Sequence, residues 1–127
     1  MKRLFFMEKD IKIWKGEIES IATEIAFYQR VLNSYLKKKD TKCVKKQIFF
    51  LEKCVSISID NQNYLGSLNT LVNKVVQLKE CDDMQCEMYF LDKHAEFKRN
   101  IETYFSDYRE FKKEIFVCLN EWVEEYV

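Results

Sequence analysis

The sequence predicts an all-α protein, an elongated antiparallel bundle of three long helices that run up, down and up. Proline is absent, and glycine occurs only twice in 127 residues. Sheets need frequent turns, which draw on these two residues, whereas helices avoid both. Apolar residues also recur at alternating steps of three and four, the spacing of one helix face. The chain is long enough for one core, so we expect a single helical-bundle domain over residues 1–127.

The first predicted helix covers residues 3–36. Its apolar stripe occupies the a and d positions of about five heptads, as in a helix that lies along other helices. The pattern stops at the run KKKDTK (residues 37–42), where lysines suit a helix C-terminus because the last carbonyls carry partial negative charge. The stripe consists of Leu4, Met7, Ile11, Trp14, Ile18, Ile21, Ile25, Tyr28, Leu32 and Tyr35.

The second predicted helix covers residues 41–80, with Asp40 or Thr41 as its N-cap. Two adjacent apolar seams run along it, and together they predict a wide buried face that contacts several neighbours. The first seam contains Val44, Ile48, Leu51, Val55, Ser58, Gln62, Leu65, Asn69, Val72 and Val76. The second contains Phe50, Cys54, Ile57, Asn61, Tyr64, Leu68, Leu71, Val75 and Leu78.

The stretch DNQNYLGS, residues 60–67, offers an alternative. A break there would divide the segment into two short helices and give a four-helix bundle. Asn, Gly and Ser lower helix propensity, although isolated cases are tolerated inside a helix. An unbroken helix matches the length of its two neighbours, so the sequence favours three helices.

The third predicted helix covers residues 83–125, and Asp82 or Asp83 can act as its N-cap. Its stripe is as regular as the first. The stripe consists of Phe90, His94, Phe97, Ile101, Tyr104, Tyr108, Phe111, Ile115, Cys118 and Trp122.

The composition argues against several partners. With 21 basic and 21 acidic residues the formal net charge is zero, so a general attraction to nucleic acid or anionic membranes is not expected. No apolar segment approaches the ~20 residues that span a bilayer. The first ten residues hold too short an apolar run for a secretion signal. The five cysteines then indicate a cytoplasmic protein with reduced thiols.

Motifs for catalysis are lacking. A di-metal helical bundle needs two Glu-x-x-His pairs, but the sequence has one histidine, His94, and Leu91 precedes it by three. There is no Gly-rich phosphate loop and no G-x-S-x-G motif. Cys81 and Cys86 lack the C-x-x-C spacing of redox and zinc sites. We therefore expect neither enzymatic activity nor a cofactor.

His94 occupies a seam position, where we expect a polar layer with Asn69 that fixes the helix register. The alternative is a pocket for a small ligand or a metal around Asn69, His94 and Tyr104. A weaker alternative is phosphate or nucleic-acid contact by the lysine-rich turn Lys37–Lys46.

Apolar residues outside the seams point to an interface. Phe6, Ile13 and Phe27 share one heptad position on the first helix, with Ser20 between them, and an aligned stripe of this kind indicates a contact surface. Ten Phe, seven Tyr and two Trp are more aromatic residues than a narrow three-helix core encloses. We expect a homo-oligomer or capture of a partner helix through this stripe, with Phe49, Phe50 and Phe105 as extensions. The predicted function is protein–protein contact.

Overall fold

The computed structural model describes residues 2–36 and 41–126 of the chain, with side chains over residues 6–34 and 44–121. It contains α1 (Lys2–Leu36), α2 (Thr41–Lys79) and α3 (Met84–Tyr126). The described part has no strand, which confirms the all-α fold with three long helices. Each observed boundary lies within one residue of the predicted ranges 3–36, 41–80 and 83–125.

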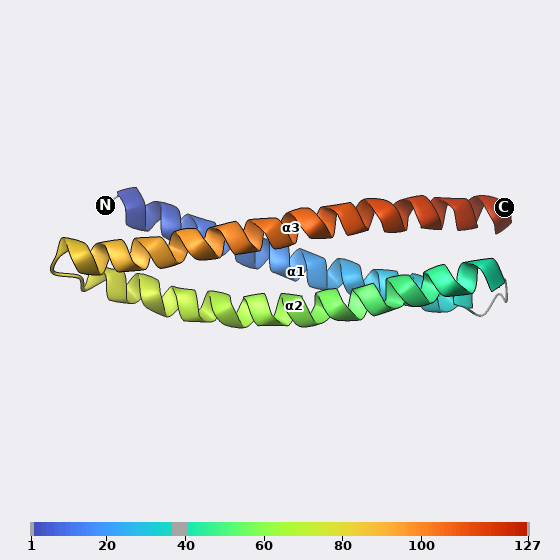
Figure 1. Ribbon diagram of the computed structural model, residues 1–127, viewed down its shortest axis with the longest axis horizontal. Coiled ribbons are helices and arrows are strands. Elements are labelled where there is room, and N and C mark those ends of the chain that lie inside the picture. Colours follow the sequence, from blue (N-terminus) through green and yellow to red (C-terminus); the bar gives the residue numbers. More distant parts are fainter. Residues whose placement is uncertain (1, 37–40, 127) are drawn as a thin grey trace.

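The three helices lie side by side as a rod (Figure 1). α1 and α3 run in one direction and α2 runs back. Lys79 of α2 is paired with Glu8 near the start of α1, whereas Asn61 of α2 contacts Ile18 further along α1. Since α3 has 43 residues, the rod is about 65 Å long at 1.5 Å per residue.

α2 is continuous through residues 60–67, so the four-helix alternative is wrong. The polar residues of this stretch do not interrupt the helix, because one of them is buried against α1 and the others are exposed to solvent. Asn61 is buried, and its side-chain amide donates to the carbonyl oxygen of Ile18 at 2.9 Å. Gly66 is exposed. Packing of the helix offsets the cost of about 1 kcal/mol that an interior glycine carries.

The core is built from one stripe of each helix. The predicted stripes of α1 and α3 are buried or half-buried wherever their side chains are described. In α2 only the second seam is buried. The core cluster contains Trp14, Ile18, Ile21, Ile25, Tyr28 and Leu32 of α1, Phe50, Cys54, Leu68 and Leu71 of α2, and Ile101, Tyr104, Phe105, Tyr108, Phe111, Ile115, Cys118 and Leu119 of α3.

The prediction of a wide buried face on α2 is wrong. Ile48, Val55, Val72 and Val76 of the first seam are exposed, and Leu51 is half-buried. In a bundle of three helices each helix has two neighbours, and both approach α2 from the side of the second seam. The first seam therefore faces outward.

The connection between α2 and α3 is fixed at both ends. The Asp83 carboxylate accepts a hydrogen bond from the backbone N–H of Cys86 at 2.8 Å, so Asp83 is the N-cap of α3. Cys81 and Cys86 form a disulfide with their Cα atoms 5.6 Å apart. The prediction of reduced thiols is wrong for this pair, because the turn brings the two side chains together. Cys54, by contrast, is a buried thiol.

Both glycines are expected to destabilise the fold. A Cβ atom added at Gly16 or at Gly66 would meet no atom within 4 Å. Because alanine loses less backbone entropy in a helix, Gly16→Ala and Gly66→Ala should each raise the free energy of unfolding by about 0.5–1 kcal/mol. Urea denaturation followed by circular dichroism measures the change. Ala22→Gly, at an exposed site of α1, is the matched control and should show the opposite sign. A loss of stability in the alanine variants would contradict the continuous helices.

The disulfide gives a second prediction. Because it closes a short loop, replacing both cysteines by serine should lower the free energy of unfolding by about 2 kcal/mol, as the chain-entropy relation gives. The tryptic peptide of residues 80–93 contains both cysteines. Its mass should rise by two hydrogen atoms on reduction. An unchanged mass, together with unchanged stability of the serine variant, would show that the bond is not formed.

Candidate functional site

A buried polar cluster joins the three helices near the middle of the rod. The side-chain amide of Asn61 on α2 donates to the carbonyl oxygen of Ile18 on α1. The hydroxyl of Tyr104 on α3 donates to Asn61 Oδ1 at 2.9 Å and lies 3.3 Å from the carbonyl oxygen of Ile57. The Tyr104 ring also stacks on Tyr64, with centroids 4.7 Å apart. Both polar groups of the Asn61 side chain are therefore satisfied, and the cluster sets the register of the bundle.

His94 is held by α1. Its Nε2 atom lies 3.1 Å from Asp10 Oδ2, and its ring packs on Trp14 with centroids 5.2 Å apart. Its Nδ1 atom is buried and has no hydrogen-bond partner within the described residues. The predicted polar layer with Asn69 is wrong, because Asn69 is exposed on the outward face of α2. The polar partner of His94 is Asp10, which the sequence analysis did not single out.

The structure does not bring Asn69, His94 and Tyr104 together in one pocket. Tyr104 lines two hollows between α2 and α3, together with Asp60 and Asp107, and neither hollow contains His94 or Asn69. Among the described residues, no group of three or more His, Cys, Asp and Glu side chains is placed to hold a metal ion.

The buried tyrosines are in their neutral form. Burial raises the pKa of Tyr28 to about 12, and the nearby Glu24 carboxylate adds to the effect. Burial likewise raises the pKa of Tyr104, with Asp60 nearby, and that of Tyr108. Burial also raises the pKa of the Cys54 thiol to about 11. These groups are therefore uncharged at neutral pH.

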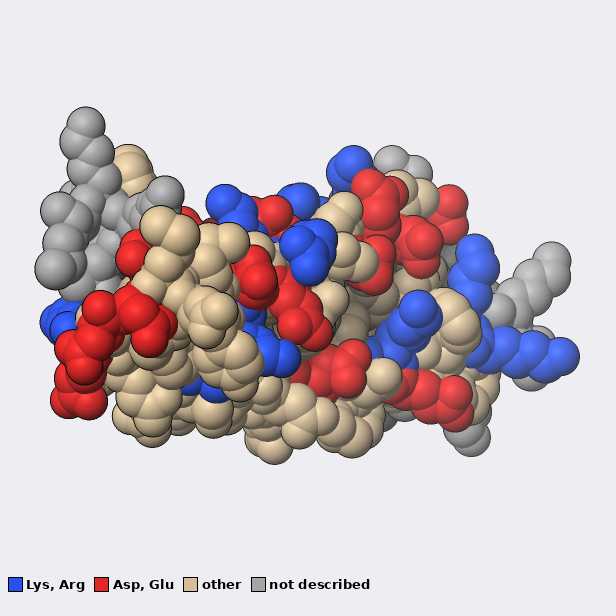
Figure 2. All heavy atoms as spheres, turned by 60° about the vertical axis from the view of Figure 1, so that its left-hand side comes forward, with Lys and Arg blue, Asp and Glu red and all other residues tan. Residues whose placement is uncertain are grey.

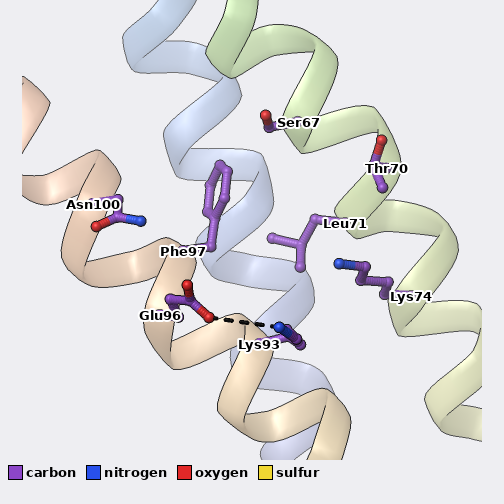
Figure 3. A pocket seen from close by; sticks show the side chains of 8 residues that line it. All are labelled: Ser67, Thr70, Leu71, Lys74, Lys93, Glu96, Phe97 and Asn100. Carbon is purple, nitrogen blue, oxygen red and sulfur yellow. Dashed lines mark ion pairs between the residues drawn. The ribbon is translucent and has the colours of Figure 1, made fainter.

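A groove runs between α2 and α3, and Figure 3 shows one hollow in it, of about 290 Å³. Leu71 of α2 and Phe97 of α3 are directed into the space between the helices. Lys74 and the ion pair of Lys93 with Glu96 lie along its edges. Ligand pockets enclose most of their ligand, whereas this hollow is a shallow opening between two helices. It is a shallow groove between two packed helices rather than a ligand pocket.

The α1 stripe, defined as Phe6, Ile13 and Phe27, lies on the surface. The exposed fractions of these residues are 56%, 52% and 50%. The stripe continues towards α3: the ring of Phe27 packs edge-on to Tyr28, and Tyr28 packs edge-on to the exposed Phe116. The predicted apolar surface on α1 is therefore present.

Of the three extensions predicted for this surface, one is exposed and two are buried. Phe49 is exposed. Phe50 and Phe105 are wrong, because both are buried: Phe50 packs against Phe111, and Phe105 packs beside Tyr104. Phe50 belongs to the seam of α2 that faces the core.

A second apolar surface was missed in the sequence analysis. The first seam of α2, here called the outward seam, exposes four aliphatic side chains at 43–53%. Its three polar members were the signal that could have found it, because Ser58, Gln62 and Asn69 suit a face in contact with water better than a core. The outward seam consists of Val44, Ile48, Leu51, Val55, Ser58, Gln62, Leu65, Asn69, Val72 and Val76.

Charged side chains are mixed over the surface. Figure 2 shows acidic and basic residues interspersed on the face it presents. Of the lysine-rich turn, Lys45 and Lys46 are exposed, whereas residues 37–40 lie outside the described part of the chain. None of the helices, as far as they are described, is long and apolar enough to cross a bilayer.

Compared with known protein families, with curated proteins and with solved structures, the chain gives no match.

The polar cluster predicts that Asn61 and Tyr104 contribute to stability as a pair and not independently. Tyr104→Phe should lower the free energy of unfolding by about 1–3 kcal/mol, because Asn61 Oδ1 would be left buried without a donor. Asn61→Leu should also destabilise, and the double variant should cost less than the sum of the two single changes. The matched control is Tyr64→Phe, since the hydroxyl of Tyr64 forms its bond to Asn100 at the surface. Additive effects in this double-mutant cycle would show that the two side chains do not act together.

Proposed function

We propose that this chain is a non-enzymatic helical-bundle protein that acts through protein–protein contacts and self-associates through its exposed apolar faces. The observation that carries the proposal is the alignment of half-exposed apolar side chains along two helices. The α1 stripe repeats at heptad spacing, with Ser20 between Ile13 and Phe27. The outward seam repeats likewise, with its aliphatic side chains towards the two ends and three polar residues nearer the middle. Each face thus presents aligned apolar groups to an approaching helix.

The size of these faces supports contact with a protein. From Phe6 to Phe27 the α1 stripe extends about 32 Å, and the outward seam extends about 48 Å, at 1.5 Å per residue. Single exposed apolar residues are common on monomers, whereas aligned groups of them favour a contact with another protein. A second copy or a partner helix of another protein would cover them.

The two other functions are less well supported. A small ligand around Asn69, His94 and Tyr104 would need a shared cavity, and these side chains lie apart. Phosphate contact by Lys37–Lys46 stays a prediction, and the balanced net charge of zero gives it no support.

The cytoplasmic location also stays a prediction. The Cys81–Cys86 disulfide argues against it, because such bonds persist mainly in oxidising compartments.

Sedimentation velocity at increasing micromolar concentrations tests the proposal. The wild type should show reversible self-association. Phe27→Lys combined with Val55→Lys places one charge on each apolar face and should weaken that association at least tenfold, because a buried unpaired charge is costly.

The matched control is Asn63→Lys combined with Thr103→Lys. It adds the same two charges at exposed sites that belong to neither apolar face. It should sediment like the wild type. A wild type that remains monomeric at every concentration would refute the self-association.

A further inference from the structure

We propose that two copies of the chain pair through the outward seam of α2, side by side, parallel and in register. This inference rests on the proposed function and names the contact that brings about the self-association. The outward seam of one copy then packs against the outward seam of the other. A two-fold axis that runs along the rod relates the two copies.

The residue types along the seam suit a pair of helices rather than a larger assembly. Heptad position a holds Ile48, Val55 and Val76, and position d holds Leu51 and Leu65, with Val44 and Val72 at the two ends of the seam. In parallel coiled coils, β-branched residues at a with leucine at d favour two strands over three or four. The same helix has a different set of residues, with Phe50 and Tyr64 included, on the face that packs inside the bundle. The two faces of α2 thus suit two different kinds of packing.

The polar members of the seam also fit this pairing. Gln62 and Asn69 occupy a positions and Ser58 a d position. In a parallel, in-register pair each meets its own copy, so amide faces amide and hydroxyl faces hydroxyl. A polar residue at an a position specifies register at a cost in stability. Any shift by one heptad would place Asn69 or Gln62 against an aliphatic side chain.

Neighbouring α1 leaves room for a second copy. Ala22 shares its heptad position with Glu8, and Glu8 pairs with Lys79 of α2. This face of α1 therefore borders α2. Ala22 and Ala26 are both exposed, and their small side chains allow a helix to lie against α2 at the close distance that knobs-into-holes packing needs.

The area agrees with a reversible dimer. A seam about 48 Å long and about one helix diameter wide, 10–12 Å, has a footprint of roughly 500–600 Å² on each copy. Specific interfaces of standard size begin at about 600 Å² per partner, and smaller ones belong to weak, transient complexes. The seam lies at or just below this limit, so we expect a weak and reversible dimer.

Paired charge variants test this geometry. One variant carries Ile48→Lys and Val55→Lys, and the other carries Ile48→Glu and Val55→Glu. Both positions are about half exposed, so the substitutions leave the core intact, and circular dichroism checks the folding of each variant. In a parallel pair each position faces itself. Each variant alone should therefore dimerise at least tenfold more weakly than the wild type, and an equimolar mixture should recover dimers that contain one copy of each.

The matched control uses the same charges at Asn63 and Thr70, two exposed positions of α2 that are also seven residues apart. Each control variant should dimerise like the wild type, and mixing should bring no gain. Sedimentation velocity gives the mass, and native mass spectrometry identifies the mixed dimer.

The outcomes separate this inference from the proposed function. A wild type that dimerises with no effect of the seam variants overturns the pairing through α2 and leaves self-association in place. Seam variants that are monomeric alone and remain monomeric when mixed overturn the parallel register. A monomeric wild type overturns both proposals.

Discussion

The constraint on which this structure depends is the number of neighbours that a helix has in a bundle of three. Each helix touches two others, so it can bury one face and no more. α1 and α3 each bury one apolar face in the core, whereas the α1 stripe of Phe6, Ile13 and Phe27 stays exposed. α2 carries two seams. One of them packs in the core, and the other is left at the surface with aliphatic side chains in contact with water. The proposed function and the proposed pairing both follow from this second, exposed seam of α2.

Polar contacts add specificity to the apolar packing. Apolar stripes at heptad spacing specify the register of helices only weakly, because each layer resembles the next, whereas a buried polar residue fixes it. Asn61 does this, since its amide finds both the carbonyl oxygen of Ile18 and the hydroxyl of Tyr104 at only one register. The contact of His94 with Asp10 acts in the same way nearer one end of the rod. The Asn61 side chain and the Nε2 atom of His94 thus both hold the helices in register.

Much of the fold could be predicted from the sequence because helix boundaries and stripes depend on local chemistry. The stripe from Met7 to Leu32 is set by spacing alone, and Asp83 caps α3 as the turn residues indicate.

The choice between the two seams of α2 could not be predicted in this way. It depends on the side from which the neighbouring helices approach, and spacing does not contain that information. Ser58, Gln62 and Asn69 pointed to the exposed seam. Asn61 made this pattern ambiguous, because it is a polar residue in the buried seam. Its burial depends on a hydrogen-bond partner 43 residues away.

Phe105 lies off the stripe of α3 yet is buried, since the packed arc of a helix is wider than two heptad positions. The disulfide was missed because only the turn geometry brings Cys81 to Cys86.

Small-angle X-ray scattering tests the central claim most directly, because it measures mass and length in one experiment. Copies that cover the surplus seam side by side and in register should double the scattering mass as concentration rises. The longest dimension should stay near that of a single rod, about 65 Å for α3 at 1.5 Å per residue. A mass that stays at one chain would show that the exposed seam of α2 remains in water. A doubled mass with a clearly longer particle would show that the copies meet at another surface or in another register.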